Sequence, residues 1–310
     1  MTKYILKRLL ANLISLWMII TATFFLMKGI PGDPFGQDKA LPKEILQSLY
    51  EYYKLNDPWY KQYGHYLKSI VTWNLGLSFK YKSRTVNEII KTTFPISAIL
   101  GLEAMVLSIT FGIILGTIAA LKQNKWEDYL AMIVAVIGIS IPSFILAACL
   151  QYLFAIKINL LPVARWGTFQ HSILPAIALS ALPTAFIARL TRANMIEVLS
   201  MDYIKTARAK GLNDFIVIVK HAMRNALLPI ITYIGMLMAN ILTGSFIIEK
   251  IFGIPGLGQW FINSITNRDY TMIMGITVFY SMILLTTIFF LDLAYHWIDP
   301  RIKIGKKSMR

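Results

Sequence analysis

Long apolar segments with almost no charge constrain this chain more than any other feature of its sequence. A helix that crosses a bilayer needs about 20 predominantly apolar residues. Six segments approach or exceed this length, at residues 9–27, 95–121, 129–156, 172–188, 225–248 and 271–291. The fourth is short and can extend toward Leu190, and only the second contains a charged residue, Glu103. The sequence therefore predicts an all-α membrane protein with six transmembrane helices.

The overall composition agrees with this class. Hydrophobic residues make up 56% of the 310 residues and charged residues 15%, whereas about a quarter of a soluble domain is charged. A net charge of +15 would indicate nucleic-acid binding in a soluble protein. In a membrane protein, the meaning of the charge depends on where the charged residues lie along the chain. The single cysteine, Cys149, lies in an apolar run and excludes a disulfide within the chain or a cysteine-based metal site.

Lysine and arginine predict the orientation. More than half of the 31 basic residues fall in four short segments, which are the amino terminus, the loop after residue 121, residues 189–224 and the tail at 301–310. Short basic segments stay in the cytoplasm, whereas long segments translocate largely regardless of charge. The segment at residues 28–93 is long and is therefore predicted to be external. The chain is predicted to lie in the cytoplasmic (inner) membrane with both termini in the cytoplasm.

The external segment predicts a cap of short helices after the first span. Helical patches occur at 42–54 and at 59–73, separated by the turn sequence NDP. Tyr63, Tyr66, Leu67 and Ile70 recur there at helical spacing. The aromatic side chains fit either a belt at the membrane interface or a docking platform for an outside partner; they are Tyr50, Tyr52, Tyr53, Trp59 and Tyr60. We expect a division into residues 1–94 and a five-span core at 95–310.

A charged stretch on the cytoplasmic side, DYIKTARAKGLNDF at residues 202–215, predicts two short helices. Asp202 is expected to cap a helix over 203–210, and Gly211 supplies a left-handed stop. Asn213 is expected to cap a second helix over 214–228, which Pro229 ends. The result is a helix pair joined by a tight turn.

The alanines of this stretch predict a contact surface. Ala207 and Ala209 stand among cations. Small side chains let another protein approach the backbone closely, and the cations fit an acidic or carbonyl-rich groove. The alternative is a basic amphipathic loop that lies on anionic headgroups.

These residues resemble a known family. DYIKTARAKGL followed by HAMRNALLP resembles the coupling loop of permease subunits in binding-protein-dependent ABC importers. The resemblance narrows to the oligopeptide and dipeptide permeases through PGDPF, IEKIFGIPGLGQWFINSITNRDY and DLAYHWIDPRIK. One departure is Asn74, where relatives usually have an acidic residue. The resemblance covers almost the whole chain.

The resemblance implies that residues 193–228, the coupling segment, seat in a groove of a cytoplasmic ATPase. The residues implied in coupling are Asp202, Tyr203, Thr206, Ala207, Arg208, Ala209, Lys210, Gly211, Leu228 and Pro229. It also implies a heterodimer with a paralogous permease, two ATPase subunits that bind ATP and magnesium, and an external peptide-binding protein. This chain would form half of a translocation pathway for oligopeptides and would hold no cofactor.

Residue patterns for catalysis are not found in the sequence. There is no G-x-x-x-x-G-K-[S/T] phosphate loop and no His or Glu cluster with metal spacing, so we expect a transport subunit without enzymatic activity or a metal site. Other cargoes of the same family stay open, namely dipeptides, nickel chelates, glutathione or a metallophore. An ion-driven secondary transporter is a further alternative, although it often has inverted repeats and several intramembrane charges.

Glu103 is the candidate residue of the substrate pathway. It lies about two turns into the second predicted span. A carboxylate exposed to lipid there would cost several kcal/mol, so the side chain should face the bundle interior or a watery cavity. Two roles remain open. Glu103 either pairs with a donor of a neighbouring span and fixes packing, or it offers a transient anionic contact to a peptide.

Overall fold

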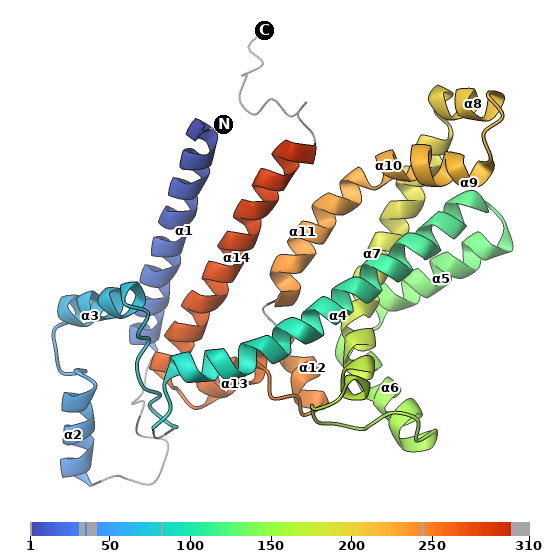
Figure 1. The fold of residues 1–310 in the computed structure, drawn as a ribbon. Coiled ribbons are helices and arrows are strands. Elements are labelled where there is room, and N and C mark those ends of the chain that lie inside the picture. Colours follow the sequence, from blue (N-terminus) through green and yellow to red (C-terminus); the bar gives the residue numbers. More distant parts are fainter. Residues whose placement is uncertain (1, 31–34, 36–41, 82, 243–244, 299–310) are drawn as a thin grey trace. The chain divides into compact units, whose positions relative to one another are not determined.

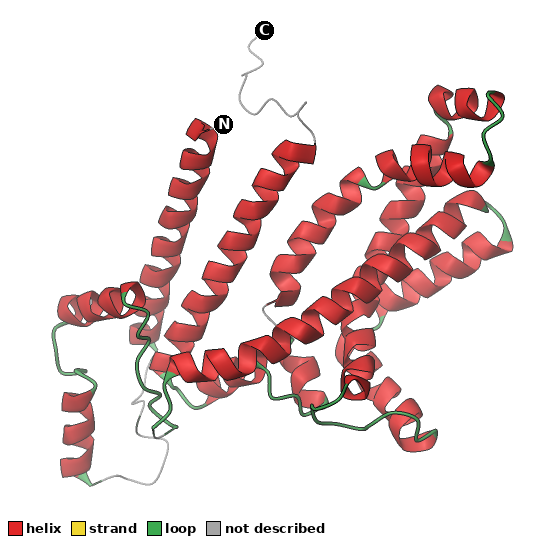
Figure 2. Cartoon of the chain, in the orientation of Figure 1, coloured by secondary structure: helices red, strands yellow, loops and turns green. Residues whose placement is uncertain are grey.

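A computed structural model describes residues 2–30, 35, 42–81, 83–242 and 245–298. In this part of the chain the regular structure is helical, apart from an isolated bridge between Leu77 and Thr85 (Figures 1 and 2). The all-α prediction is therefore confirmed. The chain divides into two units, residues 1–96 with 256–289 and residues 97–255 with 290–310.

Among the described residues, four helices are long and apolar enough to cross a membrane, and two bent helix pairs bring the number to six if each pair is one span. The four helices are α1 (Thr2–Gly29), α4 (Val86–Leu121), α7 (Phe169–Leu199) and α14 (Tyr270–Ile298). Helix α7 continues well beyond the predicted end at residue 188, through Arg189 and Arg192. The charge of Arg192 is compensated, because its side chain donates two hydrogen bonds to the buried carboxylate of Asp128, at 2.6 and 2.7 Å.

The third predicted span is bent. Its first part is helix α5 (Trp126–Ser140). The second part is a run of α6 (Ser143–Leu150) and the π-helical segment η1 (Gln151–Lys157). The chain bends by 106° between the two parts. The span predicted over 129–156 is therefore broken into two helical pieces. The cause is Pro142, since a residue before proline avoids helical backbone, and Ile141 has an extended backbone with ψ 119°.

The fifth predicted span is also broken. A helical run formed by α9 (Asp214–Ile216), the π-helical η2 (Val217–Ala222) and α10 (Met223–Ala226) bends by 56° into the next helix. Helix α11 (Leu228–Leu242) then begins, with Pro229 in its first turn. Proline is tolerated there because a first-turn N–H has no partner within the helix. Pro229 thus starts a helix where we had expected it to end one, and a separate α12 (Phe246–Ile251) follows.

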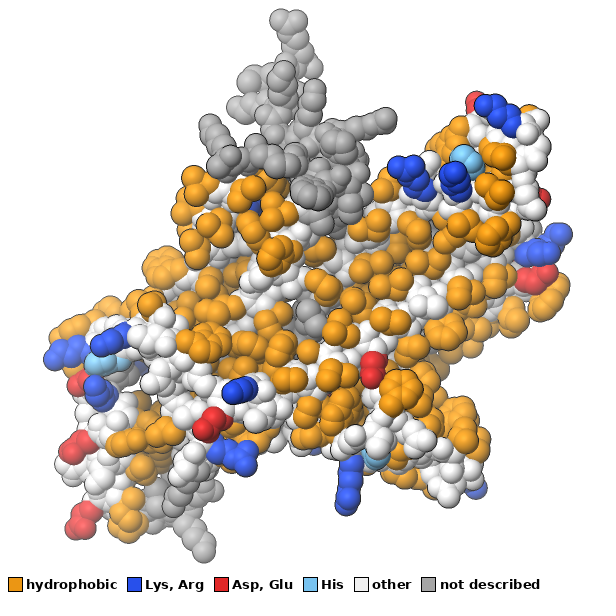
Figure 3. Space-filling view, in the orientation of Figure 1, with side chains coloured by type: hydrophobic (Ala, Val, Ile, Leu, Met, Phe, Trp, Pro, Cys, Tyr) orange, Lys and Arg blue, Asp and Glu red, His pale blue; other side chains and the backbone are white. Residues whose placement is uncertain are grey.

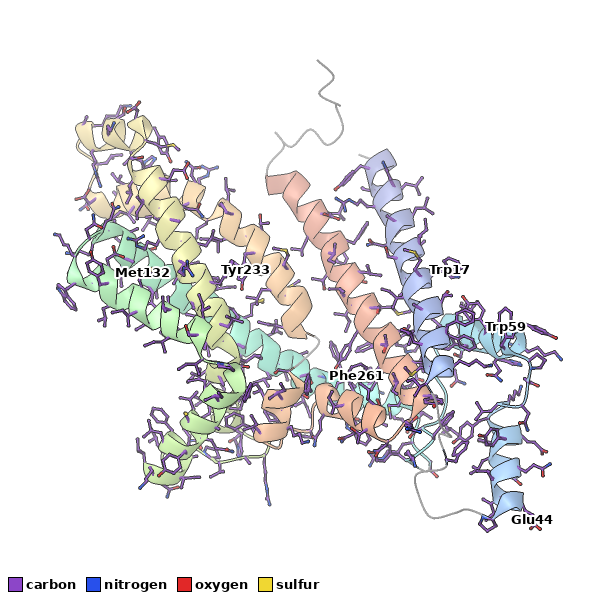
Figure 4. All side chains as sticks on the ribbon, turned by 180° about the vertical axis from the view of Figure 1, so that it is seen from behind. Trp17, Glu44, Trp59, Met132, Tyr233 and Phe261 are labelled. Atoms are coloured by element: carbon purple, nitrogen blue, oxygen red, sulfur yellow. The ribbon has the colours of Figure 1, made fainter. Side chains whose placement is uncertain are left out.

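The unit of residues 1–96 and 256–289 contains the predicted cap. Helices α2 (Lys43–Tyr52) and α3 (Trp59–Val71) match the two predicted patches, and α13 (Leu257–Thr266) precedes α14. Tyr66 and Ile70 of α3 are buried in a core with Phe24 of α1, whereas Trp59 at the start of α3 is 55% exposed (Figure 4). The cap is therefore attached to α1 by its own apolar face.

Helices α4 and α7 pack closely along a seam of small residues in the other unit. A Cβ atom added at Gly112 would lie 2.7 Å from the Ile187 side chain, and one added at Gly116 would lie 2.4 Å from the carbonyl oxygen of Ala188. Ser108 donates a hydrogen bond across the same seam to the carbonyl of Ser180, at 3.3 Å. Small residues allow such close backbone approach between membrane helices.

This seam yields a stability prediction. Gly116→Ala should lower the apparent Tm of the detergent-solubilised protein, because the new methyl group meets backbone that cannot rotate away; overpacking of this kind costs about 1–3 kcal/mol. Gly64→Ala in α3 is the matched control, since nothing lies within 4 Å of its added Cβ and alanine is the better helix former. A Gly116→Ala protein that melts no lower than Gly64→Ala would contradict the close seam.

Candidate coupling site

Helix α8 (Asp202–Ala209) ends in a tight, fully bonded turn. Gly211 has a φ of +77°. Its N–H donates to the carbonyl of Arg208 at 2.9 Å, and the N–H of Leu212 donates to that of Ala207 at 3.4 Å. This pair of bonds is the Schellman motif, which needs a left-handed residue and therefore favours glycine. The predicted glycine stop is confirmed.

The second helical run begins at a capped residue, as predicted. The side-chain oxygen of Asn213 accepts a hydrogen bond from the N–H of Phe215 at 2.9 Å. Across the turn, Nε of Arg208 lies 3.4 Å from Oδ1 of Asp214. The turn is thus held by backbone bonds, a side-chain cap and an exposed ion pair, of which the last contributes least.

Asp202 does not occupy the N-cap position that the sequence predicted. Helix α8 begins at Asp202 itself, and the preceding Met201 makes no side-chain capping bond. The carboxylate instead pairs with Lys205, at 2.9 Å between Oδ1 and Nζ. An acidic residue in the first turn is still favourable because it faces the positive end of the helix dipole.

The helix pair has an apolar core of its own. Ile204 is fully buried and Ala207 is 7% exposed. The core joins the ends of α4 and α7 to both helices of the pair, through Ala120, Met195, Val198, Ile204, Ala207, Val217, Ala222 and Ala226. Ala207 therefore packs inside the chain, whereas Ala209 is exposed. Of the two small residues, only Ala209 presents its side chain at the surface.

The remaining predicted coupling residues are exposed, and they are Asp202, Tyr203, Thr206, Arg208, Lys210, Gly211, Leu228 and Pro229. Figure 3 shows basic side chains gathered over α8 to α10. The sequence interpretation missed Asn225, whose side-chain amide donates to the Tyr203 hydroxyl at 2.7 Å and ties α10 to α8. Leu228 and Pro229 belong to α11, beyond the bend.

Glu103 lies apart from the coupling core, in a groove of about 430 Å³ between α4 and α7. Apolar side chains such as Leu102, Val106 and Phe169 form its wall, and the hydroxyl of the lining residue Ser172 donates to the carbonyl of Phe169 at 2.9 Å. The Oε2 atom of Glu103 is buried and has no hydrogen-bond partner among the described residues. The described residues also contain no group of three His, Cys, Asp or Glu side chains that could hold a metal ion.

Comparison with known proteins identifies the class of this chain. Residues 112–304 match the model of the binding-protein-dependent transport system inner membrane component family, and residues 1–101 match the model of its amino-terminal region. The chain belongs to this family of membrane permease subunits, as predicted. It is a multi-pass membrane protein.

Individual relatives match along almost their whole length. A dipeptide transport system permease protein of Bacillus subtilis is 52% identical over 308 residues, which cover 99% of this chain and 100% of the relative. An oligopeptide transport system permease protein of Salmonella typhimurium is 44% identical and covers 98% of this chain and 100% of the relative.

Solved structures support the same fold. An inward-facing MetNI methionine ABC transporter chain has a TM-score of 0.56 at 15% identity, covering 68% of this chain and 96% of that one. A chain of an amino acid ABC transporter has a TM-score of 0.54 at 17% identity, covering 68% and 94%. The prediction of a permease subunit of an ABC importer is confirmed.

The turn after α8 yields a prediction that needs no partner. Gly211→Val should accelerate hydrogen exchange at the amides of residues 211 and 212, because valine resists positive φ. A cost of about 1–2 kcal/mol corresponds to roughly 5- to 30-fold faster opening. Gly211→Asn is the control, since asparagine tolerates this conformation and an added Cβ meets nothing within 4 Å. Equal exchange in both variants would exclude backbone conformation as the reason for glycine.

Proposed function

We propose that this chain forms half of the translocation pathway of an ATP-driven importer for oligopeptides and converts the movement of separate ATPase subunits into movement of its membrane helices. The observation that carries the proposal is the helix pair of the coupling segment, with its own buried core and exposed outer face. Work passed through a flexible loop would be dissipated, whereas a bonded turn and a core joined to α4 and α7 transmit it. Alternating access would follow from rocking of helix groups around a central site.

The proposed assembly has four further components. They are a paralogous second permease, two cytoplasmic ATPase subunits that bind ATP and magnesium, and an external peptide-binding protein. This chain would supply neither the ATPase activity nor a cofactor. Residues 1–94 would act as the first span with the external cap, and residues 95–310 as the five-span core.

Dipeptides are the second candidate cargo. The Bacillus subtilis relative, at 52% identity, is named a dipeptide permease, whereas the Salmonella relative, at 44%, is named an oligopeptide permease. ATP-dependent uptake into proteoliposomes that contain the complete complex tests both, with labelled dipeptides and pentapeptides supplied through the binding protein. Uptake that is unchanged when ATP is omitted would overturn the proposal.

Both termini and the coupling segment are proposed to be cytoplasmic. In a Cys149→Ser background, a single cysteine at Asn56 should react with an impermeant maleimide added to intact cells, and one at Phe215 should react only after the membrane is opened. Both positions are exposed, so failure to react reports the membrane side. Labelling of the Phe215 position from outside would contradict contact with a cytoplasmic ATPase.

The ATPase contact yields a prediction at the exposed alanine. Ala209→Glu should lower ATP-dependent uptake by at least about tenfold, because it places a negative charge where the proposed groove is acidic or rich in carbonyls; a like-charge contact at an interface costs several kcal/mol, and about 1.4 kcal/mol is already tenfold. Ala209→Lys has similar bulk and should transport better than Ala209→Glu. Both should keep wild-type exchange at residue 211. Ala207→Glu should instead accelerate exchange at residue 211, because its charge disrupts the core of the helix pair before any partner binds. Equal uptake by Ala209→Glu and wild type would remove α8 from the ATPase contact.

Glu103 is proposed to line the peptide pathway. Its buried Oε2 atom has no donor within the described chain, which favours this role over packing. Glu103→Gln keeps the size and the hydrogen-bonding capacity but removes the charge. We expect altered uptake rates for basic peptides, little change for neutral ones, and normal assembly. Equal loss for all peptides, or an unstable complex, would instead indicate a packing role.

A further inference from the structure

A pocket with a buried polar group lies in the unit of residues 1–96 and 256–289, to which all of its described lining residues belong. A pocket of about 200 Å³ is formed by α1, α3, the segment after α3 and the first turns of α14. Its walls include Phe24, Tyr66, Leu75, Phe79 and Met274. The pocket is partly open, so a small ligand could enter between its aromatic walls.

The hydroxyl of Tyr66 has no hydrogen-bond partner among the described residues, although the residue is only 9% exposed. The ring is held in place, because it stacks on Phe24 at 5.9 Å between centroids. Burial raises the pKa of the phenol, so the group stays neutral and can donate. A buried donor without an acceptor costs about 1–3 kcal/mol, which an occupant with an acceptor would recover.

Hydrogen bonds within the chain also fix residues that line the pocket. The side-chain amide of Gln62 donates to the carbonyls of Leu55 and Asp57, at 2.8 and 2.7 Å. The backbone at Phe79 is fixed, since its N–H donates to the carboxylate of Asp269 at 3.1 Å. The walls therefore keep their positions without an occupant.

A lysine supplies positive charge at the rim of the pocket. This lysine is Lys54, and no acidic side chain is among the described lining residues. An adjoining pocket of about 190 Å³ shares Phe24 and Phe79 and adds Lys28. Apolar walls, a neutral buried donor and a cationic rim fit a small ligand with an apolar body and a carboxylate.

We propose that this pocket binds the carboxyl-terminal residue of a peptide, with its apolar side chain between the aromatic walls and its carboxylate accepting a hydrogen bond from Tyr66. Lys54 supplies positive charge at the rim. The volume is below the roughly 300–1,000 Å³ of pockets that enclose drug-sized ligands, so one residue fits and a whole oligopeptide does not. The identity of the ligand as a peptide rests on the proposed function.

Photocrosslinking on the complete complex in nanodiscs tests this inference. Alanyl-photoleucine should label the pocket, at Leu75, Phe79 or Met274 by mass spectrometry. Alanyl-leucine should compete, whereas alanyl-leucinamide, which lacks the carboxylate, should compete at least tenfold less well. Lys54→Asn should weaken competition by alanyl-leucine and leave competition by alanyl-leucinamide unchanged. Asparagine is the chosen substitute because it tolerates the φ of 55° at this position.

Matched tyrosine variants isolate the hydroxyl. Tyr66→Phe should weaken competition by alanyl-leucine about three- to tenfold, the value of one hydrogen bond. Tyr63→Phe should leave it unchanged, because the Tyr63 hydroxyl already bonds Thr21 at 2.7 Å and does not line the pocket. Equal effects of the two variants, or labelling that oleate displaces and peptide does not, would overturn the inference, the latter in favour of a lipid carboxylate.

Uptake of the same dipeptide separates this inference from the proposed function. ATP-dependent uptake without labelling of the pocket overturns the pocket and leaves the transport function standing. Labelling that peptide displaces, without any uptake, supports the pocket and overturns the transport function.

Discussion

Close contact between the backbones of α4 and α7 is the constraint on which the position of the coupling segment depends. Lipid tails are as apolar as leucine, so membrane helices associate through packing and not through the hydrophobic effect. At Gly116 an added Cβ would lie 2.4 Å from the Ala188 backbone. Met195 and Val198 of the coupling core follow within three turns of Ala188 on the same helix. The coupling segment is therefore attached to a helix that cannot shift against α4 without breaking the seam.

The breaks in the helices follow from the same solvent. Backbone groups in a bilayer must be satisfied within the protein, so a bend needs a local chemical cause. Pro142 supplies one for the bend after α5, and Pro229 begins a new helix after the bend at Leu227. Both prolines were visible in the sequence. Their geometry was not, because proline either ends a helix or starts one, and the surrounding packing decides which.

Residues with strong local preferences were the ones predicted well. Gly211 and Asn213 form the stop and the cap that their chemistry favours, and α3 begins at Trp59 and buries the predicted face. Ala207 could not be placed in the same way. A small residue among cations fits both an outer contact and an inner one, and only the packing of α8 on Val217 and Met195 assigns it to the core. The groove around Glu103 and the pocket at Tyr66 depend on residues far apart in sequence, which periodicity does not connect.

The inward position of Ala207 bears on how the helix pair would act as the proposed lever. If both alanines faced a partner, the stiffness of the turn would depend on that partner being bound. With Ala207 in the core and Ala209 outside, the stiffness of the turn and the proposed contact would depend on different residues of one short helix. The Schellman bonds at Gly211 and the cap at Asn213 lie within this chain, so the turn would keep its shape without a partner. Binding of an ATPase would have little ordering entropy to offset, so more of the binding free energy would remain to move the helices.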